Sequence, residues 1–164
     1  MITSTPDTHI ESVAEHALAL MLSLAKRIPQ LDQRVRHGEW PRGNITLLRG
    51  KTLGIIGLGG IGQRVAKRAS GFDMRVIYWS RVRKPELELE LGVVWVEDLG
   101  SLLDEADYVS LHVPLTPETE FLIGQNEFRR MKQDSFLINT SRGRTVDSRE
   151  LYNALSTGEI AGAA

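Results

Sequence analysis

GLGGIG, at residues 57–62, carries three glycines in the spacing G-x-G-x-x-G. The apolar stretch KTLGII precedes it, and the residues that follow place Ile61, Val65 and Ala66 on one face of a helix. Between a strand and a helix, such glycines let the backbone turn tightly and approach a pyrophosphate, which free N–H groups at the helix start can bind. We therefore predict a dinucleotide-binding turn, with the whole stretch beside the ligand: Gly57, Leu58, Gly59, Gly60, Ile61 and Gly62. The alternative is a turn that only connects a strand to a helix.

Outward from this turn, short apolar runs alternate with segments of helical periodicity. We expect strands at residues 51–58, 74–79, 93–96, 108–113, 135–140 and 160–164, and helices at 62–70, 99–106, 125–132 and 147–158. The pattern predicts an α/β fold, a Rossmann-type doubly wound parallel sheet with helices on both faces. The sixth run ends with the chain at Ala164, so we expect the sheet to be truncated at its C-terminal end.

The first 44 residues differ from the rest. Apolar residues recur at helical spacing from Val13 to Ile28, and Pro29 is expected to kink or restart the helix. Leu20 and Leu22 widen the apolar stripe so far that the helix must lie in a core or be covered by another chain. The stretch RHGEWPRGN predicts a linker. We divide the chain into a long interdomain helix with its linker, 1–44, and an incomplete dinucleotide-binding domain, 45–164.

Composition narrows the classes of function. The 164 residues fit one domain, and 41% hydrophobic and 25% charged residues with a net charge of −1 are typical of a soluble globular protein. This balance does not favour nucleic acid or an anionic membrane surface as a partner, and the apolar run at 17–25 is too short to span a bilayer. The absence of cysteine excludes disulfides and thiolate metal sites and permits a cytoplasmic location.

The second predicted strand ends in SRVRK, where this kind of fold usually has an acidic residue for the adenosine ribose. Ser80 follows Gly57 by 23 residues (80 − 57), which puts the segment at that strand end. A hydroxyl and three cations would hold a 2′-phosphate, whereas an acid would repel it. We predict a preference for NADP, with NAD possible, and cofactor contacts from Ser80, Arg81, Val82, Arg83 and Lys84. A solvated basic loop is the alternative.

Two patterns near the C-terminal half have local structural interpretations. Thr116 followed by Pro117 indicates a helix start, with a capping residue and a proline at the first helical position. Asp147 with Glu150 is a capping pair, and we assign it no chemistry.

Four stretches, in order, carry a family resemblance: VAEHALALMLSLAKR, LRGKTLGIIGLGGIGQRVAKR, ADYVSLHVPLTPET and LINTSRGRTVDSREL. Through them the sequence resembles the D-isomer-specific 2-hydroxyacid dehydrogenases over almost its whole length. The pattern SRxRKPE after the second strand makes it most similar to the glyoxylate/hydroxypyruvate reductase branch. The resemblance implies the nucleotide-binding lobe, without the substrate lobe, of an NADPH-dependent enzyme that reduces small 2-oxo acids to D-2-hydroxy acids.

The resemblance also implies roles for individual residues. In this family an arginine in an N-x-x-R-G motif grips the substrate, and here that arginine is Arg142, in NTSRG. Its guanidinium would hold a carboxylate and stabilise negative charge on the keto oxygen. A structural arginine in a turn is the alternative. The remaining cofactor contacts implied by the resemblance are Val113, Pro114, Thr119, Thr140, Ser141 and Arg142 itself.

The family's catalytic glutamate and acid/base histidine lie beyond the strand that begins IAGAA, so this chain does not contain them. The histidines present show no metal-ligand or charge-relay spacing, and we predict no metal site. His16 and His112 are interpreted as core or interlobe residues, and His9 and His37 as solvated. We expect the chain by itself to bind cofactor but to catalyse poorly or not at all, since proton transfer has no donor.

Members of the family pair through the region of the long helix, and the apolar surface of that helix here also favours a homodimer. A dinucleotide-sensing corepressor is the main alternative function, because the C-terminal-binding corepressors resemble these dehydrogenases. A methyltransferase of similar fold is a further alternative, which predicts binding of S-adenosylmethionine instead. Turnover of a 2-oxo acid separates the enzyme from the sensor.

Overall fold

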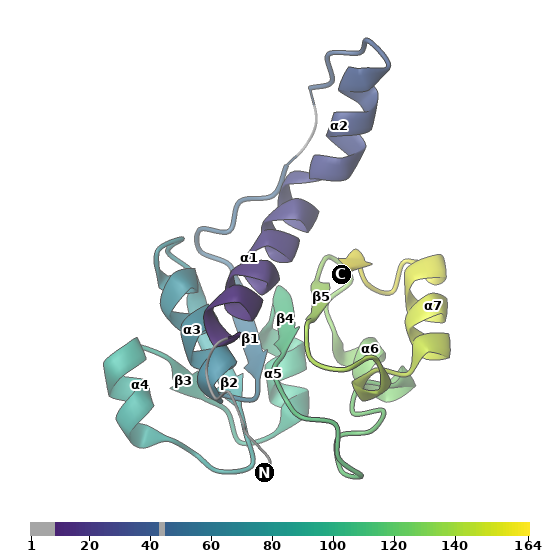
Figure 1. The fold of residues 1–164 in the computed structure, drawn as a ribbon. Coiled ribbons are helices and arrows are strands. Elements are labelled where there is room, and N and C mark those ends of the chain that lie inside the picture. The colour runs from purple at the N-terminus through teal and green to yellow at the C-terminus, as the bar shows by residue number, and fades with distance from the viewer. Residues whose placement is uncertain (1–8, 43–44) are drawn as a thin grey trace, which may run out of the picture.

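The computed structural model describes residues 9–42 and 45–164. One sheet of six parallel strands runs in the order β3-β2-β1-β4-β5-β6, which confirms the predicted doubly wound fold (Figure 1). The chain fills one half of the sheet from β1 to β3 and then crosses to β4, beside β1, so the winding reverses there. A crevice forms at the carboxyl ends of the strands at such a reversal. The strands are β1 (Thr52–Ile56), β2 (Arg75–Trp79), β3 (Val94–Trp95), β4 (Tyr108–Leu111), β5 (Phe136–Asn139) and β6 (Gly162–Ala163).

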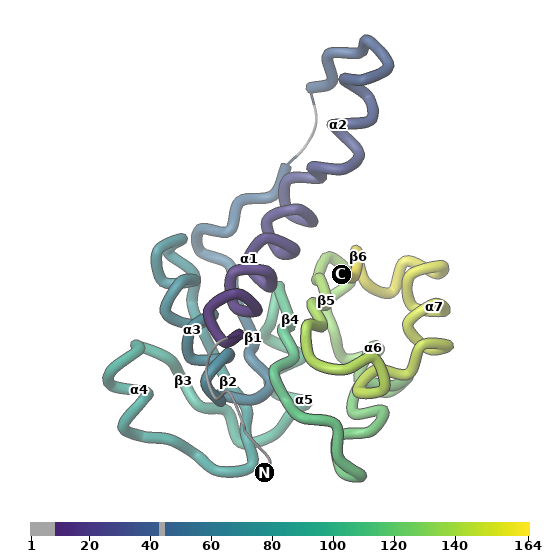
Figure 2. Tube along the Cα trace, viewed as in Figure 1, coloured from purple at the N-terminus to yellow at the C-terminus, as the bar shows by residue number. Residues whose placement is uncertain are grey.

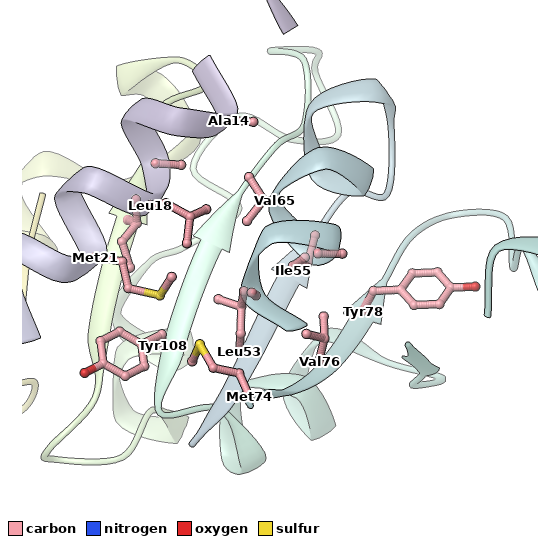
Figure 3. Close-up of a cluster of buried hydrophobic side chains, with 14 of the residues drawn as sticks. Ala14, Leu18, Met21, Leu53, Ile55, Val65, Met74, Val76, Tyr78 and Tyr108 are labelled. Carbon is pink, nitrogen blue, oxygen red and sulfur yellow. The ribbon is translucent and has the colours of Figure 1, made fainter. Parts of the chain in front are cut away.

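Apolar side chains on both faces of the strands place the sheet in the middle of the protein. Every residue of β1 and β4 is buried. On one face Leu53, Val76 and Tyr108 pack under α1 and α3 (Figure 3). On the other face Ile77 and Val109 pack under α5, α6 and α7. The helices are α1 (Ile10–Lys26), α2 (Ile28–Arg36), α3 (Gly60–Ser70), α4 (Pro85–Leu91), α5 (Leu99–Glu105), α6 (Gln125–Arg130) and α7 (Ser148–Thr157), with a 3-10 turn, η1, at Gly143–Thr145.

The N-terminal helix is divided into two, as the sequence predicts. α1 ends at Lys26 and is capped by Arg27, which has a left-handed φ of 52°, and α2 has Pro29 in its first turn. α1 buries Ala14 and Leu18 against α3 and β5, whereas α2 has no buried residue and projects away from the sheet (Figure 1). Residues 37–42 of the predicted linker form neither helix nor strand, and the next two linker positions lie outside the described residues. Within the described residues, every helix is too short or too polar to span a bilayer.

The structure differs from the sequence prediction at two connections. Residues 85–91, PELELEL, form α4, to which the sequence analysis assigns no element. The segment is helical although leucine and glutamate alternate in it as in a strand. The predicted helix start at Thr116 and Pro117 is wrong, since the chain makes a single turn. The Thr119 hydroxyl holds that turn by donating to the Pro114 carbonyl (2.6 Å) while it accepts the Thr116 N–H (2.8 Å). The capping role of Asp147 is confirmed, because its carboxylate accepts the N–H groups of Arg149 and Glu150.

Candidate dinucleotide site

A cavity of about 330 Å³ opens at the carboxyl ends of β1, β2 and β4. Figure 2 shows the loops that leave β2 and β4 at this end of the sheet. The cavity brings together ten of the predicted cofactor contacts: Gly57, Leu58, Gly59, Ser80, Arg81, Val82, Lys84, Val113, Pro114 and Thr119. It adds four residues that the sequence analysis did not assign to the site: Trp79, His112, Thr116 and Glu118. A larger hollow of about 510 Å³, lined by residues of α6 and α7, contains none of the predicted contacts.

Three of the four glycines in the turn, those in the G-x-G-x-x-G spacing, have different surroundings. Gly57 has a φ of 95°, and a Cβ there would lie 2.7 Å from the His112 carbonyl oxygen. A Cβ at Gly62 would lie 2.3 Å from the Gly57 carbonyl oxygen, so this glycine lets α3 pack closely on the turn. At Gly59 a Cβ would meet nothing within 4 Å, so this residue leaves space in which a ligand can approach the backbone.

The start of α3 faces this open space. Gly59 is the residue that caps α3, and no side chain among the described residues accepts a hydrogen bond from the first turn. The N–H groups of a first helical turn have no partner within the helix and carry the positive end of its dipole. With Gly59 open, the turn and the helix start fit a pyrophosphate.

The basic segment after β2 is divided between the cavity and a neighbouring helix. Ser80, Arg81 and Lys84 line the cavity, and the Ser80 hydroxyl donates to the Val82 carbonyl (2.6 Å). Arg83 is outside the residues that line it. Its guanidinium instead donates twice to Glu88 of α4 (2.9 Å each) and lies 5.1 Å from the centre of the Trp95 ring. Two of the three predicted cations are therefore at the cavity, and the third is held by a carboxylate.

A second cavity, of about 390 Å³, continues from the first. The two share His112, Val113 and Pro114, and the second extends over Ile61 to the loop after β5. There it is lined by three further predicted contacts, Thr140, Ser141 and Arg142. The predicted contacts Gly60, Gly62 and Arg83 line neither cavity. The buried Thr140 hydroxyl has no hydrogen-bond partner among the described residues, so a ligand can supply one. Fourteen of the seventeen predicted contacts thus lie along one extended path, which suits a dinucleotide better than a compact ligand.

The loop around Arg142 has a fixed backbone and an exposed guanidinium. The Arg142 carbonyl oxygen accepts from Asn139 Nδ2 (3.0 Å) and Thr145 Oγ1 (2.7 Å). Asn139 Oδ1 accepts from the Ser141 N–H (3.0 Å) and the Ser141 hydroxyl (2.8 Å). The guanidinium donates to the Ser141 carbonyl (2.8 Å), and none of the described carboxylates forms an ion pair with it. An anion in the second cavity can therefore bind Arg142 without displacing a carboxylate.

His112 lies where the two cavities meet, one residue beyond the carboxyl end of β4. One ring nitrogen, Nε2, is 2.9 Å from the Ser110 hydroxyl. Burial lowers the pKa of His112 to about 4, so the imidazole is neutral at pH 7. The sequence analysis interpreted His112 as a core or interlobe residue and did not assign it to the site, although its place at a strand end beside Val113 was the available signal. Within residues 9–42 and 45–164, no group of three potential ligand side chains could hold a metal ion.

Comparisons with known proteins agree with this geometry. A family model described as "D-isomer specific 2-hydroxyacid dehydrogenase, NAD binding domain" matches residues 18–164. The glyoxylate reductase of Thermococcus litoralis is 49% identical, over 99% of this chain and 51% of its own length. That of Korarchaeum cryptofilum is 46% identical, over 99% of this chain and 50% of its own length. The crystal structure of D-lactate dehydrogenase from Aquifex aeolicus, complexed with NAD and lactic acid, superposes with a TM-score of 0.92 at 39% identity and covers 97% of this chain and 48% of that one. The chain spans about half the length of the curated relatives it matches.

Proposed function

The chain belongs to the D-isomer-specific 2-hydroxyacid dehydrogenase family, and from that premise we propose that it is the nucleotide-binding half of a glyoxylate or hydroxypyruvate reductase. The observation that carries the proposal is the continuous path from the glycine turn to Arg142, at the reversal point of the sheet. A small 2-oxo acid is the substrate, and a D-2-hydroxy acid is the product. The chain spans about half the length of the reductases it matches, so we expect it alone to bind the dinucleotide without appreciable turnover.

NADPH is the proposed cofactor. Ser80, Arg81 and Lys84 line the cavity at the end of β2, where NAD-binding relatives of this fold use an acid. Charge-assisted hydrogen bonds contribute roughly 1.5–3 kcal/mol each, so one or two of them favour NADPH over NADH by about ten- to several-hundredfold. NADH also binds, because the glycine turn and the start of α3 contact both dinucleotides equally. It binds more weakly than NADPH because it lacks the 2′-phosphate.

Arg142 is the proposed substrate-binding residue. Its guanidinium holds the substrate carboxylate and lies close enough to the keto oxygen to stabilise negative charge there as the carbonyl is reduced. The hydrogen bonds of Asn139 and Thr145 to its carbonyl fix the backbone from which it reaches. When bound, the nicotinamide supplies the reducing equivalent. Thr140 and Ser141 orient its ribose, and the Thr140 hydroxyl, which has no partner within the described part of the chain, serves as a hydrogen-bonding group.

The proposal includes a homodimer in the cytoplasm. The exposed apolar side chains of the N-terminal region gather on and after α2, at Ile28, Val35 and Trp40, and a second copy of the chain would cover them. A chain without cysteine suits a reducing compartment.

The first test is a titration of the chain with NADPH and with NADH, followed by the fluorescence of Trp79, which lines the cavity. We expect tighter binding of NADPH, weakened by salt, and a loss of about tenfold or more in NADPH affinity in Arg81→Ala. Arg149→Ala, on the exposed surface of α7, is the matched control and should bind as the wild type does. Equal affinity for the two dinucleotides would refute the NADPH assignment and leave the family intact.

The second test distinguishes the enzyme from a corepressor-like sensor. A polypeptide that carries this domain together with a substrate lobe should reduce glyoxylate, and Arg142→Ala should lower kcat/KM by at least about a hundredfold. Dinucleotide binding without turnover in that polypeptide would favour the sensor. Binding of S-adenosylmethionine in place of a dinucleotide would favour a methyltransferase.

A further inference from the structure

The Tyr78 hydroxyl is the centre of a hydrogen-bond network between β2 and α4. Tyr78 is fully buried, and Figure 3 shows its ring leaving β2 away from the other labelled side chains. Its hydroxyl donates to Glu88 Oε1 (2.9 Å) and accepts the backbone N–H of Lys84 (2.8 Å). The hydroxyl therefore fixes the backbone of Lys84 at the point where the basic segment enters α4.

Lys84 is in turn tied to the glycine turn. Its Nζ donates to the Leu58 carbonyl oxygen (2.8 Å), across the cavity wall from β2 to β1. An ammonium group held in this way keeps two further N–H donors for a ligand. The position of the charge is thus set at both ends of the side chain, by the Tyr78 hydroxyl at the backbone and by Leu58 at the nitrogen.

Arg83 has a different environment from its neighbours. Glu88 accepts two hydrogen bonds from its guanidinium and one from Tyr78, and the Glu88 side chain is only 16% exposed. The guanidinium also lies over the Trp95 ring, within the range of a cation–π interaction. To reach a phosphate in the cavity, Arg83 would have to abandon a carboxylate that is mostly shielded from water.

We propose that Tyr78 is a positioning residue for the 2′-phosphate subsite, that Lys84 and Arg81 are its cationic contacts, and that Arg83 is held out of the subsite by Glu88. The proposal rests on NADPH being the cofactor. It divides three neighbouring cations into two that recognise the ligand and one that stabilises the loop. The preference for NADPH over NADH then depends on the buried Tyr78 hydroxyl, which does not itself contact the dinucleotide.

The decisive experiment compares Lys84→Ala with Arg83→Ala by fluorescence titration with NADPH and NADH. Lys84→Ala should lower the ratio of NADPH to NADH affinity about tenfold or more. Arg83→Ala should change the ratio by less than about threefold and leave the salt dependence of NADPH binding unchanged, because the lost charge does not face the phosphate. Arg130→Ala, which breaks a comparable two-bond pair with Asp104 away from the cavity, is the control for loss of a surface cation.

Tyr78→Phe tests the positioning role, since it removes the hydroxyl and keeps the buried ring. We expect a fall of about fivefold in the NADPH-to-NADH affinity ratio, with NADH affinity within about twofold of wild type. A merely structural role would weaken both dinucleotides alike, and that result would overturn the proposal. An Arg83→Ala loss as large as that of Lys84→Ala would also overturn it. If the wild type itself shows no preference for NADPH, the cofactor assignment falls together with the proposal, whereas a preference in the wild type with the wrong pattern of variants refutes the proposal alone.

Discussion

A neutral imidazole separates the two cavities of the site. His112 is the position where the chain leaves β4, and its carbonyl oxygen also sets the space that Gly57 must leave open. Burial disfavours the charged form and lowers the pKa of His112, so the ring is protonated only at a pH well below the ordinary histidine range. The same residue therefore shapes the turn and gives the folded protein a specific sensitivity to acid.

We expect the lowered pKa of His112 to make the folded protein less stable as the pH falls from about 6.5 to about 4. Its pKa is lowered to about 4 in the folded chain from 6.5, so the stabilisation is fully present above pH 6.5. As the pH falls below 6.5, His112 binds a proton in the unfolded chain but stays neutral in the folded chain, and this difference lowers the free energy of unfolding. Urea unfolding at pH 7.5 and pH 4.5 should show that the wild type loses about 2–3 kcal/mol more than His112→Gln between the two values. The exposed His16→Gln is the control, and an equal loss in wild type and His112→Gln would show that the imidazole is not the cause.

At the scale of an element, the glycine turn and α3 form one ligand-binding unit with two separable requirements. The fold requires glycine at Gly57 and Gly62, because a Cβ at either position would clash with a carbonyl oxygen. Gly59 leaves room for the ligand, because the space beside its backbone is open. Substitutions in one short turn should therefore affect either folding or binding.

Gly57→Ala and Gly59→Ala make this separation measurable. Gly57→Ala should lower the free energy of unfolding by about 2 kcal/mol or more, since its φ of 95° and the His112 carbonyl both oppose a Cβ. Gly59→Ala should leave the free energy of unfolding within about 0.5 kcal/mol but weaken NADPH and NADH alike by about tenfold or more. Thermal unfolding and fluorescence titration of both variants check this. Wild-type affinity in Gly59→Ala would contradict the assignment of the pyrophosphate to this turn.

The elements show what the sequence could and could not predict. The order of strands and helices followed from periodicity, and the site at the reversal point followed from the glycine spacing, because both are local patterns with strong geometric consequences. α4 was missed because its leucines alternate with glutamates, and Leu89 is in fact 91% exposed. The partner of Arg83, Glu88, lies on that helix, so the distinction between Arg83 and Lys84 could not be predicted from the segment SRVRK. His112 was missed for a related reason, since its contact with both cavities depends on tertiary packing.

At the scale of the whole molecule, α2 is the part least supported by the rest of the fold. It carries no buried residue and projects from the sheet (Figure 1). Apolar side chains nevertheless lie along it and just beyond it. Trp40 is 85% exposed and Val35 is 49% exposed. A helix of this kind gains most of its stability from packing, so the proposed second copy would complete the structure.

We therefore expect the chain to sediment as a dimer that depends on this surface. The double substitution Val35→Ser and Trp40→Ser should convert it to a monomer in analytical ultracentrifugation and leave NADPH affinity within about twofold, because neither residue lines a cavity. Tyr152→Ser is the matched control, since Tyr152 on α7 is also prominent, at 71% exposed, but lies elsewhere. If the wild type sediments as a monomer, the proposed dimer does not exist. If Tyr152→Ser dissociates the dimer as fully as the double substitution does, the contact between the two copies is not specific to α2.

The strand order also governs when the site can form. Leu53 of β1 pairs with Val76 of β2, 23 residues later (76 − 53), and with Tyr108 of β4, 55 residues later (108 − 53). Closing the longer loop costs more entropy, so we expect β4 to join after β1, α3 and β2 have assembled. The cavity needs all three strands and is therefore completed late. A dinucleotide that binds only the finished site should slow unfolding while hardly changing the rate of folding, so that the loaded protein resists proteolysis for longer than the empty one.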